Sequence, residues 1–380
     1  MRFHDITTFK LTIRHSTNKY NFLSSNSNNI PTNILEFCGI CYKNNDVEMN
    51  NSLIFIIGPT ATGKTKFSID LSLKLKESGI NAEILNCDSM QVYKGYPIGT
   101  DLPNKEELNT ITHHLFNIID VNEVYNASKY ATDAIKLIDK LHKSNILPVV
   151  VGGTNMYVES LLWPSFINKT EPINFDDEYD DYPTDQLYHK LNEVDPERAI
   201  QLHKNDRKRI IRSLLLWYNM GVKHSEVLID EKNKDNLMYN TLIFYIDCDP
   251  TIHSERILNR VNYMINNGII DEAIVLYNIY EKRSFSDKQS GIFQSIAYKE
   301  IFPFIRENAD MKSQIVIDQI RDILVNKTKK YSKRQRTWIK NRFQAKGLNI
   351  VKFDTTDLQQ FTRYIYLASG MVVDFINKKN

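Results

Sequence analysis

The 380-residue sequence is poor in cysteine, in long hydrophobic runs and in net charge, and each scarcity excludes a class of protein. Its 4 cysteines are too few for a disulfide framework, which favours a reducing compartment. Cys38 and Cys41 form a CxxC pair, but no second pair follows nearby, so we interpret them as free thiols rather than zinc ligands. No apolar run approaches the ~18 residues that a membrane span needs, so we expect no membrane contact. Because the formal net charge is only +2, any anionic partner must meet a local basic patch.

The N-terminal stretch, from Met1 to about Asn33, differs in composition from the rest of the chain. It is rich in Ser, Thr and Asn, and it contains four basic residues but only one acidic residue, Asp5. The four are Arg2, Lys10, Arg14 and Lys19. This composition resembles an organellar transit segment, and a disordered Asn-rich extension is the alternative. We therefore treat residues 1–50 as an extension and leave mitochondrial and cytoplasmic locations both open.

The segment Gly58-Pro-Thr-Ala-Thr-Gly-Lys-Thr65 fits the pattern GxxxxGK[ST] and follows a short apolar run. Such a loop directs backbone N–H groups, a helix N-terminus and a lysine toward a di- or triphosphate. Lys64 would supply the charge, and the Thr65 hydroxyl would be a ligand for Mg²⁺ shared with the phosphates. The candidate phosphate-binding residues are Gly58, Thr60, Ala61, Thr62, Gly63, Lys64 and Thr65. The chain is thus expected to bind a small molecule that carries a pyrophosphate.

From Leu53 onward, apolar strand-like runs alternate with helical stretches. The expected strands are Leu53–Ile57, Ala82–Asn86, Leu147–Val151 and Leu242–Ile246, and the first helices are Gly63–Glu77 and Ser128–Ser144. This alternation predicts an α/β fold, a P-loop NTPase-like doubly wound parallel sheet. Ligands of such sheets lie beyond the carboxyl ends of the strands, where the loop at Gly58, Asp88 and the turn Gly152-Gly153-Thr154 all fall. We expect these three segments to line one cleft.

Between about Trp163 and Tyr239 the strand pattern stops. Glu171–Asp185 is acidic and is typical of a linker, whereas Tyr182 to about Val227 is helical and basic. Beyond Pro250 we expect four helices, Ser254–Asn266, Ile269–Glu281, Phe293–Arg306 and Met311–Lys340. The predicted division is a core of residues 51–162 and 240–345, a small helical insertion domain of residues 163–239, a helical C-terminal part and a tail of residues 346–380. Nothing in the chain demands a dimer, so we expect a monomer.

The acidic residues near the P-loop limit the chemistry. Phosphoryl transfer normally needs an aspartate at the end of a second strand to help hold Mg²⁺, but the strand Leu147–Val151 ends in Gly-Gly-Thr. Asp247 is the one other candidate for an aspartate that holds Mg²⁺ at a strand end. The Asp249-Pro250 that follows it is typical of a helix start. These features favour pyrophosphate as a leaving group over transfer of a phosphate. Asp88 is either a base for chemistry or a cap of the turn that follows it.

Two further features can bind anions. Arg256 and Arg260 lie one helical turn apart and could clamp a phosphate, although a solvated helix face is the simpler interpretation of Arg256. The segment Lys327–Arg342 holds eight basic residues without an acid, together with Tyr331 and Trp338; the eight are Lys327, Lys329, Lys330, Lys333, Arg334, Arg336, Lys340 and Arg342. Basic and aromatic residues together favour contact with RNA, and a merely solvated basic helix is the alternative.

Several segments, in order, resemble the isopentenyl (dimethylallyl) diphosphate:tRNA transferases. They are GPTATGKT, CDSMQVYKGYPIGT, His113-His114-Leu115, VVVGGTNMY, DPERA, NDRKRIIRSL, GIFQSIAYKE and KTKKYSKRQRTW, between about Ser52 and Arg342. The resemblance implies a P-loop core with a helical insertion that holds the anticodon arm of tRNA. It also implies transfer of the dimethylallyl group from its diphosphate to the exocyclic amine of the adenosine 3′ of the anticodon.

The resemblance assigns roles to individual residues. Asp88 matches the base that accepts a proton from the adenine amine, and Thr154 and Arg260 would stabilise the departing pyrophosphate. The loop Gly58–Thr65 would hold the donor, with Thr65 on Mg²⁺. The residues expected to meet the RNA are Ser89, Gln91, Arg207, Arg212, Lys330, Lys333, Arg334, Gln335 and Trp338.

Three alternatives stay open at this point. After Arg342 the sequence holds no Cys or His for the zinc finger that eukaryotic members often carry. Because related enzymes prenylate free AMP, ADP or ATP to make cytokinins, a free adenine nucleotide is an alternative acceptor. A P-loop small-molecule kinase would consume ATP. A non-catalytic RNA-binding protein would keep the basic helices and tolerate the loss of Asp88.

Overall fold

The computed structural model describes residues 51–163, 179, 182–232 and 237–377. The N-terminal extension, with Cys38 and Cys41, lies outside these residues, as does most of the acidic linker. Across the described ranges, none of the helices combines the length and the apolar character needed to cross a bilayer.

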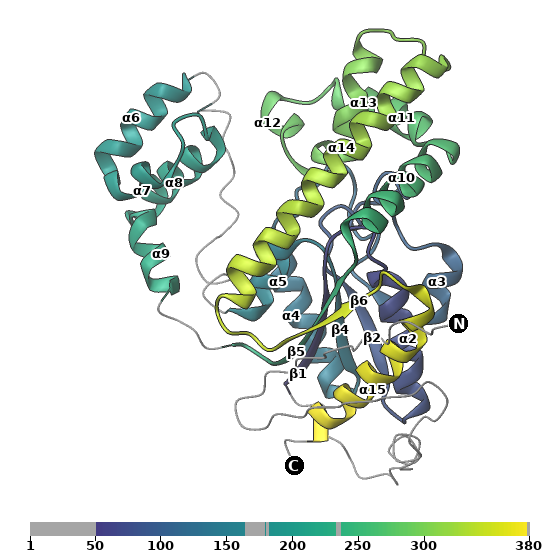
Figure 1. Cartoon of the computed structure of the whole chain (residues 1–380). Helices are drawn as coiled ribbons and strands as arrows, with labels where there is room; N and C mark the ends of the chain where they lie inside the picture. The colour runs from purple at the N-terminus through teal and green to yellow at the C-terminus, as the bar shows by residue number, and fades with distance from the viewer. Residues whose placement is uncertain (1–50, 164–178, 180–181, 233–236, 378–380) are drawn as a thin grey trace, which may run out of the picture. The chain divides into compact units, whose positions relative to one another are not determined.

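Six strands of the described chain form one parallel sheet in the order β3-β2-β4-β1-β5-β6 (Figure 1). They are β1 (Ser52–Ile57), β2 (Ala82–Asn86), β3 (His113–His114), β4 (Leu147–Gly152), β5 (Asn240–Asp247) and β6 (Ile350–Asp354). The four strands expected from apolar runs are present. The predicted α/β class with a parallel P-loop sheet is confirmed.

The strands are apolar almost throughout because helices cover both faces of the sheet. Phe55 of β1 belongs to a buried cluster with residues of α4 (Ala127–Lys143) and α5 (Asn155–Leu162). On the other face, Phe244 of β5 meets Phe67 of α2 (Lys64–Glu77), with ring centroids 6.2 Å apart. The short α3 (Lys105–Thr110) lies between β2 and β3 in the sequence.

The segment predicted as a C-terminal tail completes this sheet, so the core boundary at residue 345 was placed too early. β6 pairs with β5 from Ile350 to Asp354, and α15 (Phe361–Asn377) packs on α2 (Figure 1). Phe353 of β6 lies 5.3 Å from Phe67 and 5.5 Å from Phe244, measured between ring centroids. The strand escaped prediction because it is short and Lys352 interrupts its apolar run.

Helices fill the chain between β5 and β6. They are α10 (Pro250–Asn266), α11 (Ile269–Tyr280), α12 (Phe285–Lys288), α13 (Ile296–Arg306) and α14 (Gln314–Trp338), with a 3-10 turn η3 (Gly291–Gln294) before α13. Asp249 caps α10 by accepting from the N–H of Thr251 at 2.8 Å, as its Asp-Pro sequence predicts. The helix predicted to run through Lys340 ends at Trp338 and continues as a π-helix, η4 (Ile339–Gln344), while a 3-10 turn η5 (Leu358–Gln360) precedes α15.

The helices predicted between Tyr182 and Val227 are also present, and they surround a hydrophobic cluster of their own. They are α6 (Thr184–Val194), α7 (Pro196–Gln201), α8 (Arg207–Met220) and α9 (His224–Lys232). The cluster includes Leu187, Leu191, Ile210 and Leu214. Asp195 is buried, accepts from the Ser225 hydroxyl at 2.6 Å and caps α7 through the N–H of Arg198. The DPERA segment is therefore explained by packing within the insertion.

Candidate active site

A cavity of about 360 Å³ lies at the carboxyl ends of β1, β2 and β4. The P-loop, Asp88, the turn after β4 and Arg260 all contribute to its lining, so the expected cleft is formed. The cavity is also lined by residues in or just after β3 and by the C-terminal segment; they are His113, Phe116, Thr355, Leu358 and Phe361. An apolar wall and a cationic end are thus present in one cavity.

The P-loop has the backbone that its glycines predict. Gly58 has φ 152°, and a Cβ atom there would lie 2.1 Å from the carbonyl oxygen of Ile246. Gly63 is left-handed at φ 91° and starts α2, whose first residues Lys64 and Thr65 border the cavity. The unpaired N–H groups of this helix end, with the positive end of its dipole, make an anion site.

Lys64 faces this site with a weakened hold on its proton. Its pKa is lowered to about 8, mainly by burial; Asp88 acts in the opposite direction, and the nearby charge of Arg260 adds to the lowering. Its Nζ donates to the carbonyl oxygen of Pro59 at 2.7 Å. A phosphate oxygen would be a stronger acceptor for the same N–H group.

Asp88 caps the turn that follows it, and its side chain also borders the cavity. Its Oδ1 accepts from the N–H of Met90 at 2.9 Å and so caps the following turn. Among the described residues nothing donates to Oδ2, and the side chain borders the cavity. Asn86 fixes the position of Asp88 by binding both its N–H, at 2.8 Å, and its carbonyl oxygen, at 2.9 Å. Burial raises the pKa of Asp88 although Lys64 and Arg260 act in the opposite direction, which makes it a stronger base than an exposed aspartate.

The two arginines of α10 have different contacts. Arg260 forms an ion pair with Asp101 at 3.0 Å and donates to the Thr60 hydroxyl, so it stands over the P-loop. Arg256 donates to the carbonyl oxygen of Thr355 at 2.6 Å. Arg260 is therefore the better placed to meet a phosphate, and Arg256 holds the C-terminal segment instead of lying free in solvent.

Thr154 lies next to the cavity and organises the loop after β2. Its hydroxyl accepts from the N–H of Ser89 at 3.0 Å and lies 3.3 Å from the Ser89 hydroxyl. Gln91 borders the cavity, and its side chain donates to the carbonyl oxygen of Asp101 at 2.7 Å. The structure thus brings Gln91 to the cavity and places Ser89 beside it, where Thr154 holds Ser89.

Two residues of α14 that were expected to meet RNA make other contacts. Gln335 is only 3% exposed and binds the P-loop and the turn after β4. Trp338 is half-buried, and its indole N–H donates to Glu159 at 3.0 Å. The sequence offered no sign of these contacts, because Gln335 and Trp338 lie among basic residues that suggest an exposed helix.

The absence of acids within Lys327–Arg342 does not leave its charges unpaired, because acids reach it from elsewhere in the chain. Arg336 pairs with Asp247 at 2.8 Å, Arg342 with Glu159 at 2.9 Å and Lys327 with Glu300 at 3.3 Å. The other five are exposed and make no ion pair within the described chain; they are Lys329, Lys330, Lys333, Arg334 and Lys340. Only this smaller set remains as a basic surface.

The two insertion residues expected to meet RNA both lie on α8. Arg207 donates to the carbonyl oxygens of Tyr179 and Tyr182, the latter at 2.6 Å, so its guanidinium is used within the insertion. Arg212 is half-buried.

The donor set for a metal is small. The described residues contain no group of three or more His, Cys, Asp and Glu side chains arranged for a metal ion. Asp247, the acid considered for Mg²⁺, is held by Arg336 and by the Tyr245 hydroxyl, and Arg336 is the main partner that lowers its pKa. Thr65 borders the cavity as a single hydroxyl. A metal here would fit only with most of its ligands from phosphate and water, which is the usual case for Mg²⁺.

Two supports of the site were not predicted from the sequence. Glu272 accepts from the N–H groups of Ile98 and Gly99 and from the Tyr298 hydroxyl, which fixes the segment before Asp101. Thr355 donates to the carbonyl oxygen of Thr62 at 2.9 Å. The polar residues that follow the short strand Ile350–Asp354 were the available signal for Thr355.

A sequence profile of the family described as IPP transferase matches residues 91–342. The chain belongs to the IPP transferase family. Within it, a tRNA dimethylallyltransferase of Saccharomyces cerevisiae is 31% identical over 342 residues, which cover 88% of this chain and 78% of the relative. One from Anoxybacillus flavithermus is 33% identical over 318 residues, which cover 83% and 94%.

Solved structures of IPP transferases have the same fold. A crystal structure of a eukaryotic dimethylallyltransferase acting on tRNA gives a TM-score of 0.74 at 30% identity, covering 87% of this chain and 80% of that one. The full-length tRNA isopentenylpyrophosphate transferase of Bacillus halodurans gives 0.59 at 29% identity, covering 87% and 98%. The family resemblance stated from the sequence motifs is confirmed.

Proposed function

We propose that this protein transfers the dimethylallyl group of dimethylallyl diphosphate to the exocyclic amine of the adenosine 3′ of the anticodon in tRNA, with release of pyrophosphate. One observation carries the proposal. Asp88, which can accept a proton, borders the same cavity as Lys64 and Arg260, which can neutralise a departing diphosphate. The names of the relatives support the same reaction, and the geometry supports a role for each residue.

The donor diphosphate binds at the N-terminus of α2, where Lys64 exchanges the carbonyl of Pro59 for a phosphate oxygen. Arg260, which donates to the Thr60 hydroxyl, borders the same cavity. Thr65 would hold Mg²⁺ together with the diphosphate oxygens, and the ion would add to the neutralisation of the leaving group. The apolar wall with Phe116 and Phe361 suits the hydrocarbon part of the donor.

The acceptor amine attacks the allylic carbon as the bond from that carbon to the diphosphate oxygen breaks. The electron pair of that bond leaves with pyrophosphate, and the amine loses one proton to Oδ2 of Asp88. A positioned base of this kind contributes typically ~10²–10⁴-fold to the rate. Because adenine is stacked within an anticodon loop, the base must leave the stack to reach the cavity.

RNA binding is assigned to the five exposed basic residues of α14 and η4. We place the core in residues 51–162 and 240–377, extended from the predicted boundary, and the insertion of residues 163–239 against the anticodon arm. Mitochondrial and cytoplasmic locations are both consistent with the basic N-terminal composition. Comparing the location of the tagged full chain with that of a variant lacking residues 1–50 tests this part.

The main experiment incubates the protein with Mg²⁺, labelled dimethylallyl diphosphate, and either total tRNA or AMP, ADP and ATP. We expect label in tRNA, in N6-dimethylallyl adenosine at the position 3′ of the anticodon. Label in the free nucleotides would identify a cytokinin-forming enzyme instead. Consumption of ATP without prenyl transfer would point to a kinase, which is disfavoured because Arg336 occupies Asp247.

A further inference from the structure

Thr60 of the P-loop is held at every polar atom it has. Its N–H donates to Oε1 of Gln335 at 3.0 Å, its carbonyl oxygen lies 2.8 Å from Nε2 of His253, and its hydroxyl accepts from Arg260. The N–H of Thr60 is therefore unavailable to a phosphate, contrary to the direct role that the motif gave it. Its contacts instead fix the path of the loop.

Gln335 connects this loop to a second one. Its Nε2 donates to the carbonyl oxygen of Gly153 at 2.9 Å, so one side-chain amide joins the P-loop to the turn after β4. A Cβ atom on Gly153 would lie 2.3 Å from that nitrogen, so a side chain at this position would displace the amide of Gln335. The amide is 3% exposed, so these bonds are shielded from competing water.

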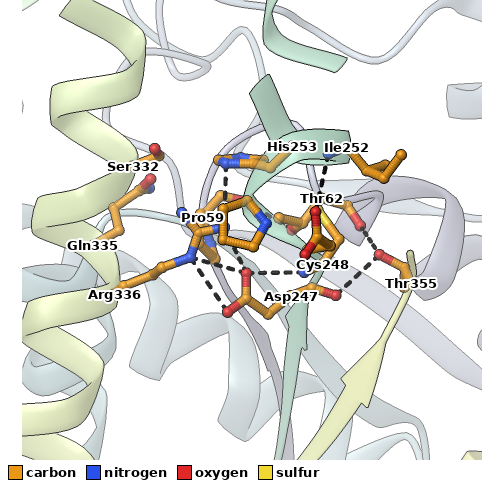
Figure 2. A network of polar contacts seen from close by, with 12 residues as sticks. Pro59, Thr62, Asp247, Cys248, Ile252, His253, Ser332, Gln335, Arg336 and Thr355 are labelled. Carbon is orange, nitrogen blue, oxygen red and sulfur yellow. Dashed lines mark hydrogen bonds and ion pairs between the residues drawn. The ribbon is translucent and has the colours of Figure 1, made fainter. Parts of the chain in front are cut away.

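Arg336 holds the loop by a second route, which Figure 2 shows. Its guanidinium binds Asp247 at 2.8 Å and Nδ1 of His253 at 3.1 Å, and His253 reaches Thr60 through its other nitrogen. Because Thr60 offers a carbonyl oxygen, Nε2 of His253 must carry the proton, and Nδ1 accepts from Arg336. The ring is therefore neutral, in agreement with its pKa, which burial lowers. Two consecutive residues of α14 thus fix both backbone polar groups of Thr60, Gln335 directly at the N–H and Arg336 through His253 at the carbonyl oxygen.

We propose that Gln335, with Arg336 beside it, is a positioning residue for the donor diphosphate. It holds the P-loop and the turn after β4 at a fixed separation before the donor arrives, so that binding does not have to order a glycine-rich loop. This inference rests on the proposed function, because it concerns the diphosphate end of the same cavity. The inner side of α14 thereby serves the donor, whereas its outer side is left for RNA.

The test replaces Gln335 by methionine, which keeps the length of the side chain and removes both hydrogen bonds. We expect the dissociation constant for dimethylallyl diphosphate with Mg²⁺, measured by calorimetry, to rise about tenfold, the effect of losing about 1.4 kcal/mol. The dissociation constant for an anticodon stem-loop RNA should stay within a factor of two, because the side chain does not face solvent. A variant that had merely lost its fold would bind both the donor and the RNA more weakly.

Ser332→Ala is the matched control. Ser332 is also buried on α14, at 2% exposure, but its hydroxyl donates only to the carbonyl oxygen of Lys329 in its own helix. This variant should bind the donor as the unchanged protein does, with a similar melting temperature. An equal loss of donor affinity in Ser332→Ala and Gln335→Met would overturn the inference.

Inorganic pyrophosphate with Mg²⁺ separates this inference from the proposed function. If the unchanged protein binds pyrophosphate but not dimethylallyl diphosphate, the proposed function fails, and weaker pyrophosphate binding by Gln335→Met still supports the positioning role. If Gln335→Met and the unchanged protein bind pyrophosphate equally, or neither binds it, the positioning role is wrong. Normal donor affinity in a folded Gln335→Met protein would also refute it.

Discussion

Arg334 and Gln335 are neighbours in the sequence, yet they belong to opposite sides of α14. Arg334 is exposed and makes no ion pair within the described chain, whereas Gln335 is buried against two loops of the cavity. Arg336, one residue further, is committed to Asp247. A basic segment can therefore contain two kinds of charged side chain: one kind neutralises an internal acid, and the other remains exposed and can bind a polyanion. Composition alone does not distinguish them.

The largest effect expected on the cavity side comes from Asp88→Asn, which keeps the cap of the turn and removes the base. Transfer in single-turnover assays should fall by about 10²–10⁴-fold, because the amide cannot accept the proton. Affinity for the stem-loop RNA should be unchanged, since the outer side of α14 is intact. Near-normal turnover in this variant would remove Asp88 from its assigned role.

The second prediction compares Arg336→Met with Arg334→Met. Arg336→Met leaves the nearly buried Asp247 without its main partner and should lower the free energy of unfolding by about 2–4 kcal/mol, slightly less than for a fully buried pair because Arg336 is partly exposed. Arg334→Met should change it by less than about 0.5 kcal/mol. Urea unfolding followed by circular dichroism measures both. Equal effects would mean that the two sides of the helix do not differ.

The third prediction concerns the outer side of α14, where substitutions should weaken RNA binding and leave donor binding unchanged. The double variant Lys333→Ala with Arg334→Ala should weaken stem-loop binding by about tenfold and reduce the slope of log affinity against log salt by ~0.7–0.9 for each phosphate that is no longer neutralised. Donor affinity, measured by calorimetry, should remain as in the unchanged protein. A salt slope that does not change would show that these side chains do not bind phosphates of the RNA.

The smallest effect expected is that of pH on donor binding. Lys64 loses its proton as pH rises through about 8, so donor affinity of the free protein should decline above that value, by less than ~10-fold at pH 9. On the acid side, kcat/KM should fall as Asp88 becomes protonated, and its raised pKa places this loss at higher pH than for an exposed aspartate. Lys64→Arg should remove the alkaline decline, because arginine stays charged. An alkaline decline that persists in Lys64→Arg would assign it to another group.

The P-loop and the strand ends were predictable because they depend on local patterns. Gly58 and Gly63 are required by backbone geometry, and parallel strands bring their carboxyl ends to one edge, so Asp88 had to lie near Lys64. The position of Gln335 was not predictable in this way. It depends on how a 25-residue helix packs against loops that precede it by 182 and 275 residues.

Distance in the sequence also explains why the ion pairs of Lys327–Arg342 were not predicted. Asp247, Glu159 and Glu300 are each far from Lys327–Arg342 in the sequence, so a local count could not include them. The sequence offered the cap and the base as alternatives for Asp88, because it could not show that the residue caps the turn and also borders the cavity.

The pairing of β6 with β5 predicts that a truncated gene could look intact by its motifs and still encode a defective protein. A premature stop after residue 345 would leave the P-loop, Asp88, the glycine turn and all of α14 in place. It would nevertheless remove the outer strand of the sheet, the aromatic contacts of Phe353 and the hydroxyl of Thr355 that binds Thr62. Such an allele would keep every recognisable motif and still lack one wall of the donor cavity, so its product should express poorly or fail to bind pyrophosphate. For this protein, an intact reading frame through residue 377 is part of the functional signature.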